Sequence, residues 1–379
     1  MALATASPFA SFDVTDGSQI RDISPVLSEA IFLDLNLLSE GISVDFGDPV
    51  NDTTYYWNEE ALNARTATVS GSITSTATSL VLTTGHGVRA TVGALAYDTT
   101  INSTEVFQVT AISTDTLTIV RAYNSTTAAS IADAATIAFI DSEQEGSDIG
   151  ADGSVKPVVR SNFTQILFAK DLLISRSQRN RTMATVAMDV ERQLANRATE
   201  LKFDLTRLAL YGEKSASSGS DTVYRTCGGM RYWTRSNGIT NSSSQALSWT
   251  VLNTINKSVV DLGKYANRLV VGTDLVGSIA GIDSSNRRML ESDTMAGYTV
   301  QEVRLAQGNV VRVVVDGRVK TGDGFLYNSD QVSMHPFAGS GMFVIAATDF
   351  VDGTKRRLGA EWGLQFRNPE ASAYFSNKT

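Results

Sequence analysis

Cysteine and histidine are nearly absent from this chain. Its 379 residues include one cysteine, Cys227, and two histidines, His86 and His335. A single cysteine cannot form an intramolecular disulfide, so we expect Cys227 to be a small, partly buried residue and not a reactive thiol. A zinc site would have to consist of carboxylates, and the usual spaced ligand motifs are missing. The sequence therefore predicts no metal site and no cofactor.

Motifs of the common catalytic classes are missing too. There is no P-loop and no Gly-x-Ser-x-Gly nucleophile elbow. The segment GHGVRA, from Gly85 to Ala90, has the spacing of a dinucleotide-binding motif, but the residues after it return to a β pattern instead of opening a helix. We interpret it as a turn, and His335, which precedes Pro336, as a packed or surface imidazole. We expect no catalytic residues and no enzyme activity.

Long hydrophobic runs and a strong basic charge are also lacking. No stretch approaches the roughly 18 to 20 apolar residues of a membrane span, and the N-terminus does not resemble a secretion signal. We expect a soluble chain in the cytoplasm, without a membrane partner. A formal charge of −8 argues against sequence-specific duplex binding through a basic face, although a container for DNA can have this balance.

The N-terminal part has few regular signals. Residues 1–40 are expected to form an extended arm that leads into a short amphipathic helix after Pro25 and ends before Gly41. The next segment contains proline, glycine and a cluster of three aromatic residues, Tyr55, Tyr56 and Trp57. We interpret this segment as a loop whose aromatic residues are candidates for contact between subunits.

Between residues 66 and 140 the composition changes to Thr, Ser, Val, Ala and Ile, with few charges. Short strand-like segments recur between turn residues, and Ser113, Thr114 and Asp115 separate two of them as in a hairpin. This pattern predicts a small all-β barrel or sandwich inserted into a chain of different character. An acidic, glycine-rich segment follows over residues 141–160.

The longest regular pattern predicts a helix over residues 183–211, with Leu194, Leu201 and Leu205 on its buried face. Before it, SNFTQILFAKDLLISRS reads as strand, and Arg176, Arg179 and Arg181 form the sharpest basic run in the chain. Salt bridges between subunits, phosphate contact and plain solvation remain open for these arginines. Farther on, Ser248 is expected to cap a helix, several strands follow, and the chain ends in a hairpin with a final strand, ASAYF.

This order of elements resembles the Hong Kong 97-type capsid fold of tailed phages, in the group whose extended loop carries an inserted domain. The resemblance covers nearly the whole chain. It rests on WNEEALNART before the insert, EVFQVTAISTDTLTIVRAYNSTTAA within it, the helix ending LALYGEK, SWTVLNTI, RLVVGTD, and GAEWGLQFRNPEASAYF at the end.

The resemblance implies an α+β fold with five parts. They are an N-terminal arm (1–40), an extended loop (41–65 and 141–160), the inserted β domain (66–140), a peripheral domain (161–248 and 340–379) with its spine helix, and an axial domain (249–339).

The function it implies is that of a major capsid protein. Copies of the chain would assemble as hexamers and pentamers into an icosahedral shell, in the bacterial cytoplasm, and become part of the virion. Packaged double-stranded DNA would lie against the inner face, and portal, scaffold or decoration proteins are further partners. Two alternatives remain: an encapsulin-like nanocompartment shell, and a β-rich tail or adhesin protein, which fits residues 66–140 but not the long helix.

Overall fold

The computed structural model describes residues 37–44, 48–60, 64–100, 104–142, 157–177, 190–220, 222–282, 287–289, 301–346 and 353–379. The chain divides into two compact units. We call Asn58–Val159 the barrel unit, and Met1–Trp57 with Arg160–Thr379 the main unit. The expected arm and its helix, up to residue 36, lie outside the described residues, as do residues 183–189 of the expected long helix.

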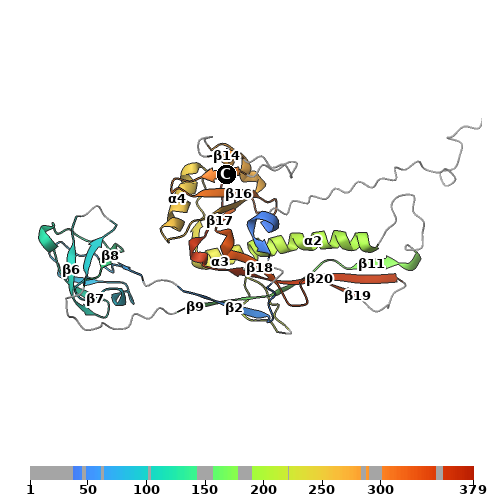
Figure 1. Ribbon diagram of the computed structural model, residues 1–379, viewed down its shortest axis with the longest axis horizontal. Coiled ribbons are helices and arrows are strands. Elements are labelled where there is room, and N and C mark those ends of the chain that lie inside the picture. Colours follow the sequence, from blue (N-terminus) through green and yellow to red (C-terminus); the bar gives the residue numbers. More distant parts are fainter. Residues whose placement is uncertain are drawn as a thin grey trace, which may run out of the picture. The chain divides into compact units, whose positions relative to one another are not determined.

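The barrel unit contains a six-stranded antiparallel sheet in the order β3-β8-β5-β6-β7-β4 (Figure 1). Its strands are β3 (Thr66–Thr68), β4 (Ser79–Val81), β5 (Leu95–Asp98), β6 (Phe107–Ser113), β7 (Thr116–Val120) and β8 (Thr136–Ile140). A bridge between Val69 and Leu82 joins the chain beyond β3 to the chain beyond β4, so the sheet closes on itself. Alternate residues such as Leu117 and Ile119 point inward and fill the core.

Two turns at one end of the barrel match the expectations from sequence. β6 and β7 form the expected hairpin, with Thr114 in the left-handed region at φ 52°. The GHGVRA segment contains only a short 3-10 turn, Gly87–Arg89, which confirms the turn interpretation. Gly87 tolerates no side chain, because a Cβ there would lie 1.7 Å from the carbonyl oxygen of Thr114. The glycine that suggested a nucleotide motif therefore allows two loops to pack closely.

The main unit contains a six-stranded sheet built around its longest strand, β20 (Gly353–Phe366). Along one edge β20 pairs with β10 (Gln165–Phe168) and β11 (Leu172–Ser175), and along the other with β18 (Val332–Pro336) and β19 (Phe343–Ala346). β1 (Ser43–Val44) pairs with β18. The sequence that reads as one strand after residue 160 forms β9 (Val158–Phe163), β10 and β11.

Helix α2 (Val190–Tyr211) covers one face of this sheet (Figure 1). Leu201, Leu205 and Leu208 are buried, as their spacing predicts, and Leu194 is half-buried. Leu201, Leu205 and Leu208 pack in one core with Leu358, Ala360, Trp362 and Leu364, the alternate residues of β20 that face the helix.

A seven-stranded sheet forms the second layer of the main unit, in the order β12-β21-β17-β13-β16-β15-β14. Its strands are β12 (Ile239–Asn241), β13 (Arg268–Val271), β14 (Arg287–Met289), β15 (Gln301–Arg304), β16 (Val310–Val315), β17 (Gly324–Tyr327) and β21 (Ala373–Phe375). Helices α3 (Met230–Asn237), α4 (Trp249–Val260) and α5 (Val276–Ala280) accompany it. Ser248 caps α4 by accepting the N–H of Val251, as expected.

One local expectation was wrong, and one strand that the sequence predicted correctly lies in a sheet that the sequence did not indicate. The aromatic segment at residues 55–57 is not a loop but part of β2 (Thr54–Glu59), which pairs with β9 in a two-stranded ladder. The final strand, β21, does not extend the C-terminal hairpin of β19 and β20 but pairs with β17 and β12. Strand pairing depends on partners distant in sequence, which local patterns do not identify. No described helix is long and apolar enough to cross a membrane.

Candidate functional site

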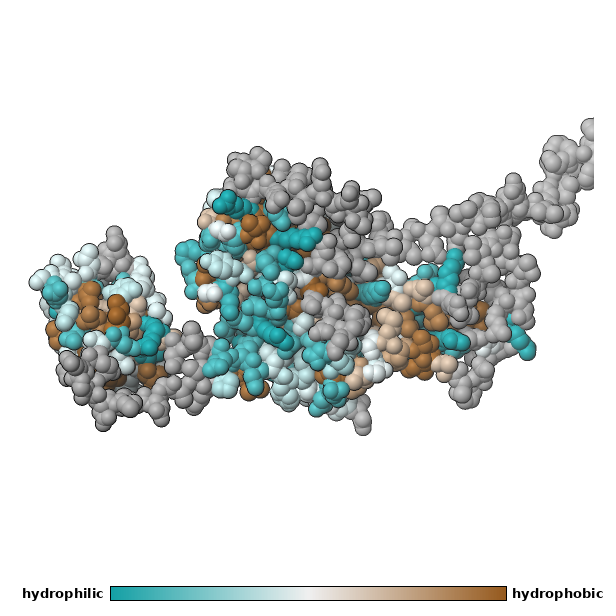
Figure 2. Space-filling view, viewed as in Figure 1, coloured by the Kyte–Doolittle hydropathy of each residue, from teal (hydrophilic) through white to brown (hydrophobic). Residues whose placement is uncertain are grey.

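The surface that stands out most in the main unit is the end of the six-stranded sheet formed by β11, β19 and residues 353–359 of β20. We call it the outer sheet segment. Figure 2 shows hydrophobic surface over this part of the molecule. The exposed apolar side chains on this segment and on the adjoining residues are Ile166, Phe168, Leu173, Met342, Val344 and Ile345. Exposed apolar side chains that gather at one place on a protein surface are typical of an interaction site.

Strand register assigns these side chains to faces of the sheet. Residues paired across strands share a face, so Phe168 and Phe343, which both pair with Gly359, lie on the face away from α2. Their rings make an edge-to-face contact with centroids 5.9 Å apart. Gly359 leaves room for them, because a Cβ there would lie 2.7 Å from each ring. Ile345 pairs with Arg357 on the same face, whereas Val344 pairs with Leu358 on the face of α2.

Charged residues border this surface along its β10–β11 edge. The Asp171 carboxylate forms ion pairs with Lys355 at 3.1 Å and with Arg357 at 3.2 Å. The Arg357 guanidinium also lies 4.1 Å from the centre of the Phe168 ring. The three ion-pair partners are all substantially exposed, so they contribute little to stability. β19, on the opposite edge, contains no charged residue.

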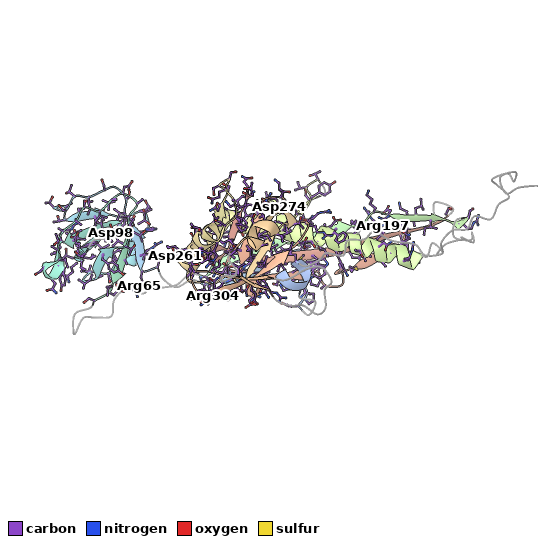
Figure 3. The ribbon with its side chains drawn as sticks, turned by 90° about the horizontal axis from the view of Figure 1, so that it is seen from above. Arg65, Asp98, Arg197, Asp261, Asp274 and Arg304 are labelled. Atoms are coloured by element: carbon purple, nitrogen blue, oxygen red, sulfur yellow. The ribbon has the colours of Figure 1, made fainter. Side chains whose placement is uncertain are left out.

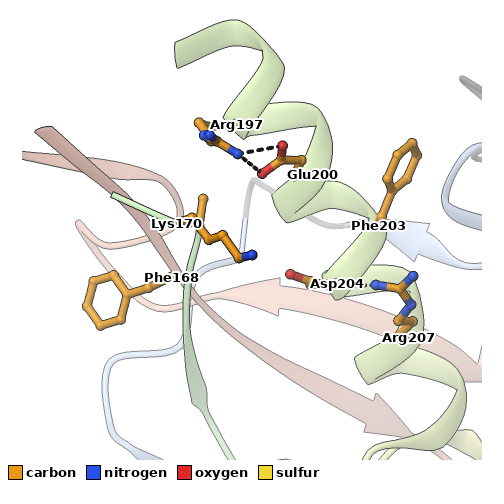
Figure 4. A pocket seen from close by; sticks show the side chains of 8 residues that line it. Phe168, Lys170, Arg197, Glu200, Phe203, Asp204 and Arg207 are labelled. Atoms are coloured by element: carbon orange, nitrogen blue, oxygen red, sulfur yellow. Dashed lines mark hydrogen bonds and ion pairs between the residues drawn. The ribbon is translucent and has the colours of Figure 1, made fainter. Parts of the chain in front are cut away.

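A pocket of about 430 Å³ lies between α2 and the end of β10 (Figure 4). Its charged lining is mostly paired: Arg197 bonds Glu200 at 2.6 Å, and Arg207 bonds Asp204 at 2.8 Å. Figure 4 shows Lys170 on the side facing the helix and Phe168 pointing away from it. Paired charges on a helix surface are typical of a solvated or protein-contacting face, and they do not form a reactive centre.

Three charged side chains of the main unit that Figure 3 labels lie on separate elements. Arg197 lies on α2, Asp261 at the end of α4 and Arg304 at the end of β15 (Figure 3). Among the described residues, no group of three or more His, Cys, Asp or Glu side chains could hold a metal ion.

Cys227 lies in a buried polar network at the base of the β2–β9 ladder. The Asn162 amide donates to the carbonyl oxygens of Gly228 and Leu364 at 2.9 and 2.7 Å, and its oxygen accepts the N–H of Gly228 at 2.9 Å. The Tyr55 hydroxyl donates to the same Leu364 oxygen. Burial raises the pKa of the Cys227 thiol to about 11. Cys227 is therefore a structural residue, as predicted, and its burial is complete rather than partial.

A partly buried ion pair lies near this network. Arg225 bonds Glu361 at 2.5 Å and donates from Nε to the Thr164 carbonyl oxygen at 2.6 Å. The Thr164 hydroxyl donates to Glu361 at 2.6 Å. The pair thus connects the loop before α3 with β20 and with the chain between β9 and β10. Because each charge is bonded, the group has a positioning role within the fold.

The three aromatic candidates differ in their surroundings. Trp57 is buried and makes an edge contact with Trp233 at 5.3 Å. Tyr55 is half-buried beneath the Leu364 carbonyl, and only Tyr56 is strongly exposed, at 67%. The side chains of Tyr55 and Trp57 are used inside their own chain, so Tyr56 is the best placed of the three for a neighbour.

The other candidates are the arginines of the basic run before α2, together with His335. Arg176 is exposed at the end of β11, whereas Arg179 and Arg181 lie outside the described residues. His335 is buried, with Nε2 2.8 Å from the Ser333 hydroxyl and Nδ1 2.9 Å from the Asp48 carbonyl oxygen. Of the two possibilities left open by the sequence, a packed or a surface imidazole, the structure shows the packed one.

The comparison with protein families decides what kind of protein this is. The model of the SU10 major capsid protein family matches residues 14–379. The chain belongs to the SU10 major capsid protein family. Members of this family are structural proteins and not a class of enzymes, and the family places the chain in the virion as a subunit that assembles with its own kind into a shell.

Several solved structures are similar to this chain. A chain from Mycobacterium phage Bobi is 10% identical, with 98% of this chain and 99% of that chain covered and a TM-score of 0.50. A chain from Mycobacterium phage Cain is 10% identical over 98% of both chains, with a TM-score of 0.49. The SrpI encapsulin of Synechococcus elongatus PCC 7942 is 11% identical over 59% of this chain and 78% of that chain, with a TM-score of 0.42.

Among curated proteins, none is similar enough to this chain to count as a relative. The SU10 major capsid protein family and the Bobi structure together establish a mixed α and β capsid fold for the chain. Reasoning from sequence missed the exposed apolar residues of the outer sheet segment. The run MFVIA reads equally well as a buried strand, and the only available signal was the lack of any charge in it.

Proposed function

We propose that many copies of this chain form an icosahedral shell of hexamers and pentamers that encloses double-stranded phage DNA. The observation that carries the proposal is the match of the SU10 major capsid protein family over residues 14–379. The finer points, which are the icosahedral symmetry, the DNA inside and assembly in the bacterial cytoplasm, go beyond family membership and are part of the proposal.

The proposed architecture is of the Hong Kong 97 type. Support comes from the order of elements: a two-stranded ladder of β2 and β9, a compact barrel between these strands, helix α2 on a long sheet, and a second sheet with α4. In this proposal residues 41–65 and 141–160 are the extended loop, residues 161–248 and 340–379 the peripheral domain, and residues 249–339 the axial domain. Two strands cross these boundaries: β21, from the proposed peripheral domain, lies in the seven-stranded sheet, and β18, from the proposed axial domain, lies in the six-stranded sheet.

The barrel, residues 66–140 in this proposal, is an inserted domain on the outer surface of the shell. A closed sheet with its own core needs no support from a shell wall. Its proposed role is to stabilise contacts between neighbouring capsomers, with receptor or decoration-protein binding as the second use. A density map of the shell tests this role, and a barrel on the lumenal side would contradict it.

Contacts between copies would use exposed side chains of the main unit, with Tyr56 and Arg176 as the described candidates and Arg179 and Arg181 next to them in sequence. DNA would meet the inner face without sequence recognition; the net charge of −8 neither supports nor excludes this contact, which requires a tolerable potential on that one face only. Portal, scaffold and decoration proteins remain proposed partners.

The test is expression of the full chain followed by size-exclusion chromatography and negative-stain electron microscopy. We expect closed particles of uniform size. Persistent monomers under all conditions, together with absence of the chain from virions, would contradict the proposal. Particles isolated from infected cells separate the two shell functions, because a phage capsid contains DNA protected from nuclease, whereas an encapsulin-like compartment contains protein cargo.

A further inference from the structure

The edge of the six-stranded sheet formed by β19 has no strand beside it among the described residues. β19 pairs with β20 on one side, and no described strand pairs with its other side. In an antiparallel pair, alternate residues of an edge strand direct their N–H and C=O groups away from the partner. About half of the backbone groups of Phe343–Ala346 therefore face outward and are able to pair with another strand.

The exposed side chains of β19 lie on both faces of the sheet, along its outer edge. Val344 and Ile345 point to opposite faces of the sheet, yet they are 46% and 45% exposed. Met342, just before the strand, is 47% exposed. A partner lying flat on one face would cover Ile345 or Val344 but not both. A strand placed alongside the edge would contact both side chains while it pairs with the backbone.

The composition of β19 has none of the usual protection against strand addition. Soluble proteins shield exposed edges with charges, proline or bulges. The strand Phe343–Ala346 consists of apolar residues with high β-propensity, apart from its alanine, and has no charge or proline. The opposite edge has Lys170 and Asp171 between β10 and β11. The edge at β19 is thus suited to pairing.

The partner that fits best is a second copy of this chain. The inference rests on the proposed function, in which each subunit is surrounded by copies of itself. The chain also carries a strand of matching character: β9 begins with Val158 and Val159, which are 48% and 62% exposed, and among the described strands it pairs with β2 alone. A two-stranded ladder is marginally stable and gains from a third strand.

We propose that β19 is a strand-addition site, at which an extended segment of a second copy pairs with the outer edge during shell assembly. The backbone supplies the hydrogen bonds, and Met342, Val344 and Ile345 supply apolar contact on both sides of the added strand. The contact forms only between copies, so the isolated subunit remains soluble until its local concentration is high.

The test compares three lysine substitutions in the full chain. Val344→Lys and Ile345→Lys alter the edge from opposite faces. Leu173→Lys, at a residue 56% exposed, alters the same face as Ile345 but on the other side of β20. All three side chains are already exposed, so the fold should tolerate them, and tryptophan fluorescence melting checks this. We expect both β19 variants to lower the assembled fraction at least about tenfold, and Leu173→Lys to leave it unchanged.

A second measurement reads the backbone directly. Hydrogen exchange of the wild-type chain before and after assembly should show at least about tenfold slower exchange at about half of the Phe343–Ala346 amides. Loss of assembly in Ile345→Lys and Leu173→Lys but not Val344→Lys would overturn strand addition in favour of a contact on one face. Normal assembly of all three variants, or unchanged exchange in β19, would also overturn it. A wild-type chain that never assembles would instead overturn the proposed function, and the assignment of a second copy with it.

Discussion

The barrel unit and the main unit differ in whether the edge strands of their sheets are paired. In the barrel, the Val69–Leu82 bridge joins the two ends of the sheet, and the backbone of the edge strands is paired within the chain. In the main unit, β20 pairs with strands along both of its edges, but the outer edge of β19 has no partner among the described strands. A closed sheet is self-sufficient, whereas an open apolar edge requires a partner. The barrel therefore has the features of an independent module, and the main unit those of a subunit.

The two units also have separate polar anchors. In the barrel, Arg121 and Glu105 are both buried and form a two-pronged ion pair with both distances 2.6 Å. Glu105 also accepts the N–H of Ala129 at 2.8 Å, and Arg121 donates to the Thr74 carbonyl oxygen at 3.0 Å. The pair holds three loops at one end of the barrel. In the main unit, two separate groups connect segments distant in sequence: the side chain of Asn162 and the Arg225–Glu361 ion pair.

All four tryptophans, Trp57, Trp233, Trp249 and Trp362, belong to the main unit. Tryptophan fluorescence therefore reports unfolding of the main unit alone. Hydrogen exchange of peptides from Asn58–Val159 reports the barrel. Unfolding of the two units can be followed separately in the same sample.

The largest effect is expected from Leu201→Asp, which places a carboxylate without a partner in the core under α2. Leu201 is fully buried, and the cost is several kcal/mol, on the order of the stability of a domain. We expect no native tryptophan fluorescence, while limited proteolysis leaves a resistant fragment that contains the barrel. Lys202→Ala, at the exposed neighbouring residue, should melt as wild type. Wild-type melting of Leu201→Asp would refute the core assignment.

The second effect, confined to the barrel, is expected from Glu105→Ala. Removing Glu105 leaves the buried Arg121 charge without its carboxylate, at a cost of about 3–5 kcal/mol. Exchange in the barrel peptides should become faster, and the tryptophan transition should not move. Thr104→Ala, next to it and exposed, is the matched control. If the tryptophan transition shifted as well, the two units would not be energetically separate.

A third, smaller effect is a dependence of barrel stability on acid. Burial by itself would raise the pKa of Glu105, but the hydrogen bonds from Arg121 and the N–H groups of Ala129 and Ala122 outweigh it, so the pKa is lowered in the fold. A lowered folded pKa means that the stabilisation is present above the unfolded value, 4.5, and is lost as pH falls through the folded pKa.

Barrel exchange should therefore accelerate below about pH 4.5 more steeply in wild type than in Glu105→Gln, which has no carboxyl group to protonate. The measurement is hydrogen exchange of the barrel peptides over a pH series, corrected for the intrinsic pH dependence of exchange. Equal slopes for the two proteins would show that Glu105 does not carry this dependence.

The smallest effect on stability is expected from Tyr56→Ala, whose side chain is largely exposed on β2. Melting should change by less than about 0.5 kcal/mol. Assembly should nevertheless weaken if Tyr56 contacts a neighbouring copy. Tyr224→Ala, at a residue 90% exposed in the loop before α3, is the control and should alter neither property. Equal assembly of both variants would remove Tyr56 from the list of contact residues.

Local patterns predicted much of this structure. The buried leucines of α2, the Ser248 cap, the β6–β7 hairpin and the turn at Gly87 all follow from residue spacing or from the conformational preferences of single residues. The misreadings involve pairing. Trp57 looked like a loop aromatic because its partners, Trp233 and the residues of β20, are distant in the sequence. The sheet of β21 could not be identified for the same reason.

Composition and pattern alone determined that this chain has a strand-rich module within a longer α+β chain, lacks the common catalytic motifs, and has an order of elements like that of a capsid subunit. Only the tertiary structure decided which strands are paired along both edges and which are paired along one. Periodicity states that a strand has apolar residues on both faces, but whether those residues are buried depends on the strands and helices beside it. FVIA in β19 and VRVVV in β16 are both rich in apolar, β-favouring residues. Among the described strands, β16 is paired on both sides, whereas β19 has a partner on one side only.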